Sequence, residues 1–430
     1  MRIPKLRHYS TLNCRYAGSW LTYWHHDDDV TTDNFFIEGQ AINKEQKVET
    51  VTDEAGLELD TERDSEIEVP FDPTKIDIIV KSMAINTLQN RLENRELDLT
   101  PDFQRQANVW NMQRKSRLIE SVLLRIPLPS FYFSEDVDGV YAVVDGLQRL
   151  CSIFHFSNVE LLNSTTGASL SALRLVGLQY LKDLEGKSFS EMERKFQRRI
   201  SELEITANII RSNTPPAVKF NVFARLNQGG MPLNAQEIRN AIFPGAWREQ
   251  LRLMAESSAF LEATDGKISP LRQDDLELVL RFVALWQLGV PHQRGAKLTL
   301  DEFLNQVVEH TLSQWSEKQW REVGGAFERA LKAACDVFGT HAFRKSIGRA
   351  NRMPINRGLF EAELVCLADL KDSELETLIH RKDKIAEVLR EALQNDADFD
   401  RALLYATGSA DASNVRLSKI HQIFHQVLDA

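Results

Sequence analysis

The chain has 430 residues, of which 43% are hydrophobic and 27% are charged, and its formal net charge is -10. This length exceeds what one ordinary hydrophobic core supports, so two or more domains are expected. The acidic balance excludes a protein that coats DNA by bulk charge, although a local basic groove remains compatible with it.

Cysteine spacing and hydropathy indicate the compartment. The cysteines Cys14, Cys151, Cys335 and Cys366 are far apart and form no CxxC pair. This predicts reduced thiols and no structural zinc. The sequence shows no signal peptide and no apolar run long enough to span a membrane. A cytoplasmic protein without a membrane partner is therefore expected.

The first 70 residues are predicted to form an extension and a linker. Residues 1–43 hold a small aromatic patch and the run His25–Asp29, which favours a polar loop because adjacent residues rarely face one metal ion. Between Glu45 and Glu68 the chain has ten acidic and two basic residues. Such a composition predicts a flexible acidic linker over 44–70. If this stretch were ordered instead, it would be expected to dock on a basic surface as an internal DNA mimic.

Residues 71–245 are predicted to form an α+β domain. Hydrophobic periodicity and turn residues set its elements. In chain order these are a helix over Ile76–Leu92, an extended segment over Leu97–Arg105, a helix over Asn111–Leu124, a strand at Phe131–Phe133, a turn at Asp138–Gly139, a strand at Val140–Val144, a strand at Ile205–Arg211 and a helix around Phe220–Asn227.

The stretch Tyr141–Leu150 is the centre of this domain. It reads as a buried strand, a tight turn at Asp145-Gly146, and a helix whose apolar face starts at Leu147. Asp145 is in the expected N-cap position, and Gly146 permits another group to approach the backbone. A helix N-terminus can hold a phosphate, Arg149 could add a bidentate contact, and Asp145 could bind a metal or orient a water. The alternative is purely structural, because Asp-Gly is a common turn and a first-turn Arg is often only solvated.

Residues 246–430 are predicted to be mainly helical. Capping boxes are expected at Asn234–Glu237 and at Thr299–Glu302. The basic run Arg194, Lys195, Arg198 and Arg199 is interpreted as a solvated helix face. Further helices are expected at 276–288, 325–338, 372–395 and 414–428.

One segment of the helical region has an unusual charge. Phe343–Gly358 has no acidic residue. Its basic residues are Arg344, Lys345, Arg349, Arg352 and Arg357. This segment is the predicted nucleic-acid contact, through phosphates. A solvated face, or packing against the protein itself, remains the alternative.

Three stretches together resemble a known family. They are Pro101–Arg105 with Trp110 downstream, Val144–Leu150, and Phe223–Asn227 followed by Gly230 and Gln236–Arg239. Their order and spacing are similar to the GmrSD restriction endonuclease N-terminal domain family, which has a DGQQR motif in a ParB/sulfiredoxin-like fold. The resemblance covers roughly 71–300.

The resemblance implies a defence enzyme that acts on foreign or modified DNA, as an NTP hydrolase or a phosphodiesterase. It also implies a nucleoside triphosphate and a divalent ion, Mg²⁺, as cofactors. The residues that match the family's motifs are Asp145, Gly146, Gln148 and Arg149, with Gln104 and Arg105 upstream and Arg225 and Asn227 downstream. Of these, Asp145, Gln148, Arg149, Gln104 and Asn227 are assigned to catalysis. Gly146, Arg149, Arg105 and Arg225 are assigned to the nucleotide, and Asp145 and Asn227 to the metal.

Two departures from the family pattern leave a rival function open. Leu147 replaces the first Gln of DGQQR, and no His-Asn-His nuclease motif is found after residue 300. The rival is a non-catalytic nucleotide- or DNA-sensing subunit that signals to a separate effector. Self-association is left open.

Overall fold

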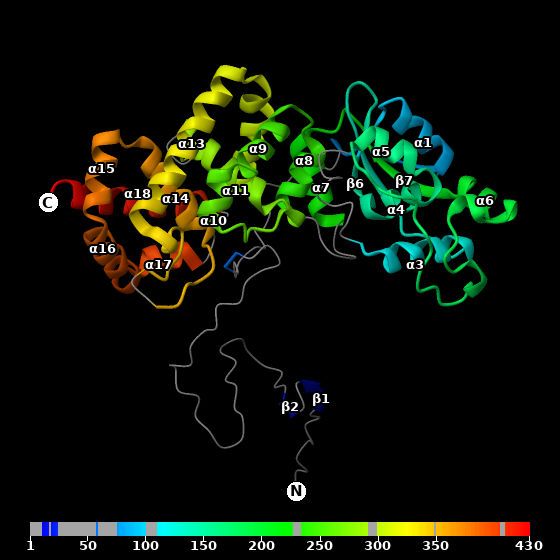
Figure 1. Cartoon of the computed structure of the whole chain (residues 1–430), viewed down its shortest axis with the longest axis horizontal. Coiled ribbons are helices and arrows are strands. Elements are labelled where there is room, and N and C mark those ends of the chain that lie inside the picture. The colour runs from blue at the N-terminus through cyan, green and yellow to red at the C-terminus, as the bar shows by residue number, and fades with distance from the viewer. Residues whose placement is uncertain are drawn as a thin grey trace, which may run out of the picture. The chain divides into compact units, whose positions relative to one another are not determined.

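A computed structural model describes residues 11–16, 19–24, 57–58, 75–99, 110–226, 234–290, 299–347, 350–404 and 409–430. The chain divides into two compact units, Met1–Glu49 and Thr50–Ala430 (Figure 1). In the first unit, β1 (Thr11–Tyr16) and β2 (Ser19–Trp24) form an antiparallel hairpin. The His25–Asp29 run lies outside the described residues.

A five-stranded mixed sheet forms the first part of this unit. Its spatial order is β3-β7-β5-β6-β4. The strands are β3 (Ile78–Ala84), β4 (Leu97–Asp98), β5 (Phe131–Glu135), β6 (Tyr141–Asp145) and β7 (Glu204–Ile210). β3 with β7 and β5 with β6 pair antiparallel, whereas β5 with β7 and β4 with β6 pair parallel. Parallel pairing directs the ends of β4 and β6 to the same edge of the sheet.

The predicted hairpin of β5 and β6 is confirmed. Asp136 closes its turn, because its Oδ1 atom accepts hydrogen bonds from the backbone N–H groups of Asp138 and Val140, at 2.9 and 2.8 Å. Gly139 has a φ of +79°, which a residue without a Cβ adopts at little cost. The turn chemistry therefore sets the register that brings β6 into the sheet.

The predicted helix over Ile76–Leu92 is wrong in its first half. Residues Ile78–Ala84 form β3, and only Ile85–Glu93 form a helix, α1. The apolar spacing in this segment fits a helix, but Ile78, Ile79 and Val80 are β-branched and favour a strand. The edge position beside β7, more than a hundred residues away in sequence, decides the outcome.

Helices cover the sheet around the smaller of two hydrophobic clusters. Besides α1 they are α3 (Met112–Leu123), α4 (Leu147–Ser157), α5 (Val159–Thr166) and α6 (Arg194–Ser201). The predicted helix over Asn111–Leu124 is confirmed, and Asn111 caps it by accepting a hydrogen bond from the N–H of Arg114 at 2.8 Å. The fully buried Phe131 and Phe133 of the sheet pack here with Leu150 and Phe154 of α4.

The remainder of the unit is helical, as predicted. Its helices are α7 (Pro216–Leu226), α8 (Ala235–Ile242), α9 (Trp247–Ala255), α10 (Ser258–Thr264), α11 (Asp274–Leu288), α12 (Leu300–Gln306), α13 (Glu317–Phe338), α14 (Arg357–Asp369), α15 (Asp372–His380), α16 (Lys382–Asn395), α17 (Ala397–Leu404) and α18 (Ala410–Leu428). α14 packs against α11, α13 and α18 and is the centre of the larger hydrophobic cluster. No described helix combines the length and the apolar composition needed to cross a lipid bilayer.

Both predicted capping boxes are confirmed. Asn234 and Glu237 cap α8 reciprocally, and Thr299 and Glu302 cap α12 in the same way. The single helix predicted over 372–395 is wrong, because the chain breaks at Arg381 into α15 and α16.

The larger cluster also includes side chains from the sheet region. Val144 of β6 and Ile210 of β7 belong to it together with α7 and α8. Arg248 of α9 reaches Asp98 of β4 at 3.3 Å. The sheet and the helical region are thus in direct contact, and the predicted division at residue 245 remains a prediction.

Two residues of the acidic stretch are held by the helical region. Leu57 is fully buried and forms a parallel bridge with Ile355, and the N–H of Glu58 donates to the Ile355 carbonyl at 2.9 Å. The Glu58 carboxylate accepts a hydrogen bond from Asn356 Nδ2 at 2.9 Å. The expected flexible linker is therefore wrong at Leu57–Glu58, because a buried leucine and paired backbone groups fix this point. The rest of 44–70 lies outside the described residues.

Candidate functional site

The predicted site is built around the turn between β6 and α4. β6 ends at Asp145, and Gly146 occupies the N-cap position with φ +97° and ψ 5°. The expectation that Asp145 caps the helix is wrong, since the cap residue is Gly146 and forms no side-chain hydrogen bond to the helix. The left-handed backbone at Gly146 is a conformation that a residue without a Cβ adopts at little cost, and it joins β6 to α4.

Gly146 also permits a close packing contact. A Cβ atom at this position would overlap the ring of Phe131, with the ring's Cε1 atom only 2.9 Å away. The close approach expected at this glycine therefore exists, and the group that makes it is the Phe131 ring on the neighbouring strand. The turn and β5 are consequently held together by van der Waals contact.

Arg149 fastens this turn to the chain before β5. Its Nη1 atom donates to the Pro129 carbonyl at 2.5 Å, and its Nη2 atom donates to the Ser130 carbonyl at 3.2 Å. Nη2 also reaches Asp145 Oδ2 at 2.8 Å, and the guanidinium lies 4.5 Å from the centre of the Phe131 ring. Arg149 thus has four protein partners and holds the Asp145 carboxylate in place.

The two charges of this pair differ in exposure. The Asp145 side chain is 47% exposed, whereas that of Arg149 is 12% exposed. Burial lowers the pKa of the Arg149 guanidinium, and the adjacent Asp145 carboxylate opposes that effect. The carboxylate is therefore the charged group that solvent can reach, with one oxygen held by Arg149.

The other residues of the central motif are on the first turn of α4. Leu147 is half-buried and packs on the smaller hydrophobic cluster, and Leu150, Cys151 and Phe154 are buried behind it, which confirms the predicted apolar face. Gln148 is half-buried, and its carbonyl accepts a hydrogen bond from Ser152 Oγ. A leucine in place of the family's glutamine therefore adds packing where a polar contact would have been.

Most of the flanking predicted residues are outside the described structure. Gln104, Arg105 and Asn227 lie outside the described residues, and so does the side chain of Arg225 at the end of α7. Among the described residues, Asp98 pairs with Ala142 in parallel register, so β4 and β6 end at the same edge of the sheet.

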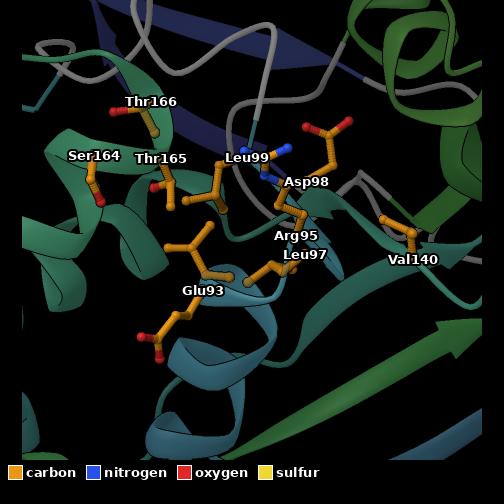
Figure 2. A pocket seen from close by; sticks show the side chains of 10 residues that line it. Glu93, Arg95, Leu97, Asp98, Leu99, Val140, Ser164, Thr165 and Thr166 are labelled. Carbon is orange, nitrogen blue, oxygen red and sulfur yellow. The ribbon is translucent and has the colours of Figure 1, made fainter.

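A cavity of about 620 Å³ lies beside β4 (Figure 2). It is lined by Leu92, Glu93, Arg95, Leu97, Asp98, Leu99, Val140, Ser164, Thr165 and Thr166. The hydroxyl groups of its α5 wall donate to backbone carbonyls of the same helix. Of the assigned residues that the structure describes in full, Asp145, Gly146, Gln148 and Arg149, none is in this lining.

The predicted nucleic-acid residues are paired with carboxylates. Arg344 Nη2 lies 3.0 Å from Asp265 Oδ2, and Arg357 Nη2 lies 2.7 Å from Asp274 Oδ1. Arg352 also pairs with Asp265. These ion pairs join the Phe343–Gly358 segment to α10 and α11.

Their burial corrects the prediction for this segment. The side chains of Arg344 and Arg357 are each only 3% exposed, and Lys345 pairs with the buried Glu58. Arg349 lies outside the described residues. Arg344, Lys345 and Arg357 are therefore not offered to a phosphate, and for these three residues the alternative of packing against the protein itself is the one observed. Glu58 was missed because its partners are almost 300 positions away.

These features define a class of protein: a mixed α/β sheet domain with an exposed carboxylate at a strand-to-helix turn, continued by a helical region. Residues 85–244 match the model of the family described as GmrSD restriction endonuclease, N-terminal domain. Residues 85–244 are therefore similar to the N-terminal domain of this family, as the motifs indicate. No curated protein and no solved structure matches the chain. The ParB/sulfiredoxin-like description stays a prediction.

Proposed function

We propose that the turn between β6 and α4 binds a nucleoside triphosphate with Mg²⁺ and hydrolyses it, or cleaves a phosphodiester, in cytoplasmic defence against foreign DNA. The observation that carries this proposal is the Asp145 carboxylate, half exposed and held by Arg149 beside the N-terminus of α4. The restriction-type family of residues 85–244 supplies the class of target, which is DNA.

The donor set is suited to Mg²⁺. This ion is usually held by one or two carboxylates together with substrate phosphates and waters. Asp145 would provide the carboxylate, and Asn227 is the second proposed ligand. When bound, the ion supplies charge neutralisation on the phosphates and activation of a water.

The residues of the turn take distinct roles in this proposal. Arg149 is a positioning residue, because its donors hold Asp145 and two backbone carbonyls. The first N–H groups of α4, with Arg105 and Arg225, would bind phosphate oxygens. Gln148 and Gln104 would orient the attacking water. The roles of Gln104, Arg105, Arg225 and Asn227 rest on the family motif alone.

A specific observation favours a second candidate, a nucleotide- or DNA-sensing subunit that signals to a separate effector. Leu147 is half-buried and packs against the smaller hydrophobic cluster, where the family motif has a polar side chain. A site with one fewer polar group can bind a nucleotide without completing its turnover. This candidate needs Asp145 and Arg149 only for binding.

Thin-layer analysis of the purified full chain with each triphosphate, with and without duplex DNA and Mg²⁺, separates the two candidates. The enzyme converts at least one triphosphate or cuts the DNA, and Asp145→Asn abolishes that activity. Binding without conversion identifies the sensor. If neither a triphosphate nor DNA binds and no DNA is cut, both candidates are excluded.

A further inference from the structure

The helices α3 and α6 are neighbours in the sheet region (Figure 1). Exposed cationic side chains on and beside them form what we call the α3–α6 basic face. It consists of Arg114 and Arg117 of α3, Arg125 two residues after α3, and Arg194, Lys195 and Arg198 of α6. In a chain with a net charge of -10, such a concentration is unusual.

The outward side of α3 carries no opposing charge. Glu120, the sole acidic residue within Met112–Leu123, is only 3% exposed. Its carboxylate accepts hydrogen bonds from the backbone N–H groups of Gln179, Tyr180 and Leu181, at 2.7 to 3.0 Å. Its negative charge is therefore satisfied inside the protein and does not neutralise the arginines outside.

α6 is fixed against α3, and aromatic rings lie beneath some of the cations. Arg199 Nη1 donates to the Leu123 carbonyl at 2.5 Å, which joins the two helices. Lys195 lies 4.8 Å from the Phe196 ring centre, and the Arg114 guanidinium lies 4.3 Å from that of Trp110. These contacts hold cationic side chains at the surface without consuming their charge.

The remaining acidic neighbours are weakly bound. Lys195 pairs with Glu193 at 2.8 Å and Arg198 with Glu202 at 3.5 Å, and all of these side chains are more than half exposed. Ion pairs this exposed contribute little free energy, so a phosphate can replace the carboxylate. Within the described part of the chain, Arg117 and Arg194 have no ion pair. Arg117 and Arg194 thus differ from Arg344 and Arg357 of the Phe343–Gly358 segment, which are buried in ion pairs with carboxylates.

We propose that the α3–α6 basic face binds the phosphate backbone of duplex DNA. This inference rests on the proposed function for its choice of DNA as the target. Because the face offers charge to phosphates and no set of groups arranged for base edges, its binding is independent of sequence. It holds DNA on the sheet region that also contains Asp145.

The experiment compares the full chain with the triple variant Arg117→Gln, Arg194→Gln, Arg198→Gln. Fluorescence anisotropy measures its affinity for labelled duplexes of two unrelated sequences between 50 and 300 mM salt, an about sixfold range over which lost phosphate contacts are readily detected. The logarithm of the association constant falls linearly with the logarithm of the salt concentration, and each lost phosphate contact makes this slope shallower by about 0.9. In the triple variant the slope should be shallower by about 2 to 3, equally for both sequences.

A matched control removes the same charge elsewhere. This control is a second triple variant, which neutralises three exposed cations of α13: Lys318→Gln, Arg321→Gln and Lys332→Gln. Its salt slope should stay near that of the wild type. An unchanged slope in the triple variant, or an equal loss in the control, overturns the proposal. Tighter binding of a single strand than of a duplex overturns the assignment to duplex DNA. Triphosphate turnover without DNA is measured in parallel, so failure of the proposed function shows as absent turnover while the DNA slopes still decide this inference.

Discussion

The Nζ atom of Lys345 lies 3.2 Å from Oε1 of Glu58, and both side chains are less than a tenth exposed. A buried lysine and a glutamate from a strongly acidic stretch thus neutralise each other across the sequence. This contact converts part of the acidic stretch from a solvated linker into a component of the helical region.

Glu58→Gln should lower the free energy of unfolding by about 3 to 5 kcal/mol, because it leaves the Lys345 ammonium buried without a counter-charge. Urea denaturation measures the loss. Glu58→Gln combined with Lys345→Met should recover part of it. As a control, Glu387→Gln removes a carboxylate from a half-exposed pair with Lys384 and should leave the urea midpoint nearly unchanged, because exposed ion pairs contribute little to stability. Equal midpoints for Glu58→Gln and wild type would contradict the structural role of this pair.

Arg149→Ala should lower stability by about 1 to 3 kcal/mol, because the carbonyls of Pro129 and Ser130 lose their donor. Asp145→Asn should melt like the wild type, since its amide oxygen still accepts from Arg149, while triphosphate turnover falls. Thermal melts and the turnover assay are run on the same preparations. Arg174→Ala, which breaks an exposed pair with Glu191, is the control for loss of a surface arginine. Full turnover in both Asp145→Asn and Arg149→Ala would exclude this turn as the functional centre.

Gly146→Ala should destabilise the protein for two reasons. The left-handed backbone costs a residue with a Cβ about 1 to 2 kcal/mol. The new methyl would also overlap the Phe131 ring, and overpacking of this kind typically costs about 1 to 3 kcal/mol more. Gly186→Ala is the matched control, because Gly186 has φ +76° and a Cβ there would meet no described atom within 4 Å, so it reports the backbone cost alone. Calorimetric melting temperatures that fall equally for the two variants would show that the Phe131 contact does not constrain the turn.

Glu363 should make stability depend on pH. Burial raises its pKa to about 8, against the opposing N–H of Phe343 and charge of Arg344. The folded chain then keeps a proton that the unfolded chain has lost between its ordinary pKa, 4.5, and about 8. Stability therefore falls as the pH rises through this window, by at most about 1.4 kcal/mol per pH unit. In Glu363→Gln, stability should fall less steeply with rising pH. Urea midpoints at pH 5.5, 6.5 and 7.5 measure this dependence. If the midpoints of variant and wild type change in parallel with pH, Glu363 does not have this role.

Local features of the sequence were sufficient for much of the fold. The capping boxes at Asn234 and Thr299 and the helix after Asn111 depend on groups within four residues of one another, so the sequence displays both partners. β3 could not be assigned in this way. Its apolar spacing fits a helix, and its strand conformation depends on β7, which lies beyond the range of any local pattern.

In the candidate site, too, the sequence predicted the local features and could not predict the tertiary contacts. The glycine turn and the apolar face of α4 follow from Gly146 and the spacing after it. The partners of Arg149 do not, because two of them are backbone carbonyls, which carry no side-chain signature. The charge of Phe343–Gly358 was equally visible in the sequence, but its neutralisation by Asp265, Asp274 and Glu58 required the tertiary structure.

The bond between Asn356 and Glu58 spans 298 positions. At a synthesis rate of about 5 to 20 residues per second, Glu58 leaves the ribosome roughly 15 to 60 s before its partner. During this interval the sheet region can complete its core before the partners of Leu57 and Glu58 have been made. The docking of Leu57 and Glu58 is therefore a late event in the life of a newly made chain, because it must wait for Ile355 and Asn356.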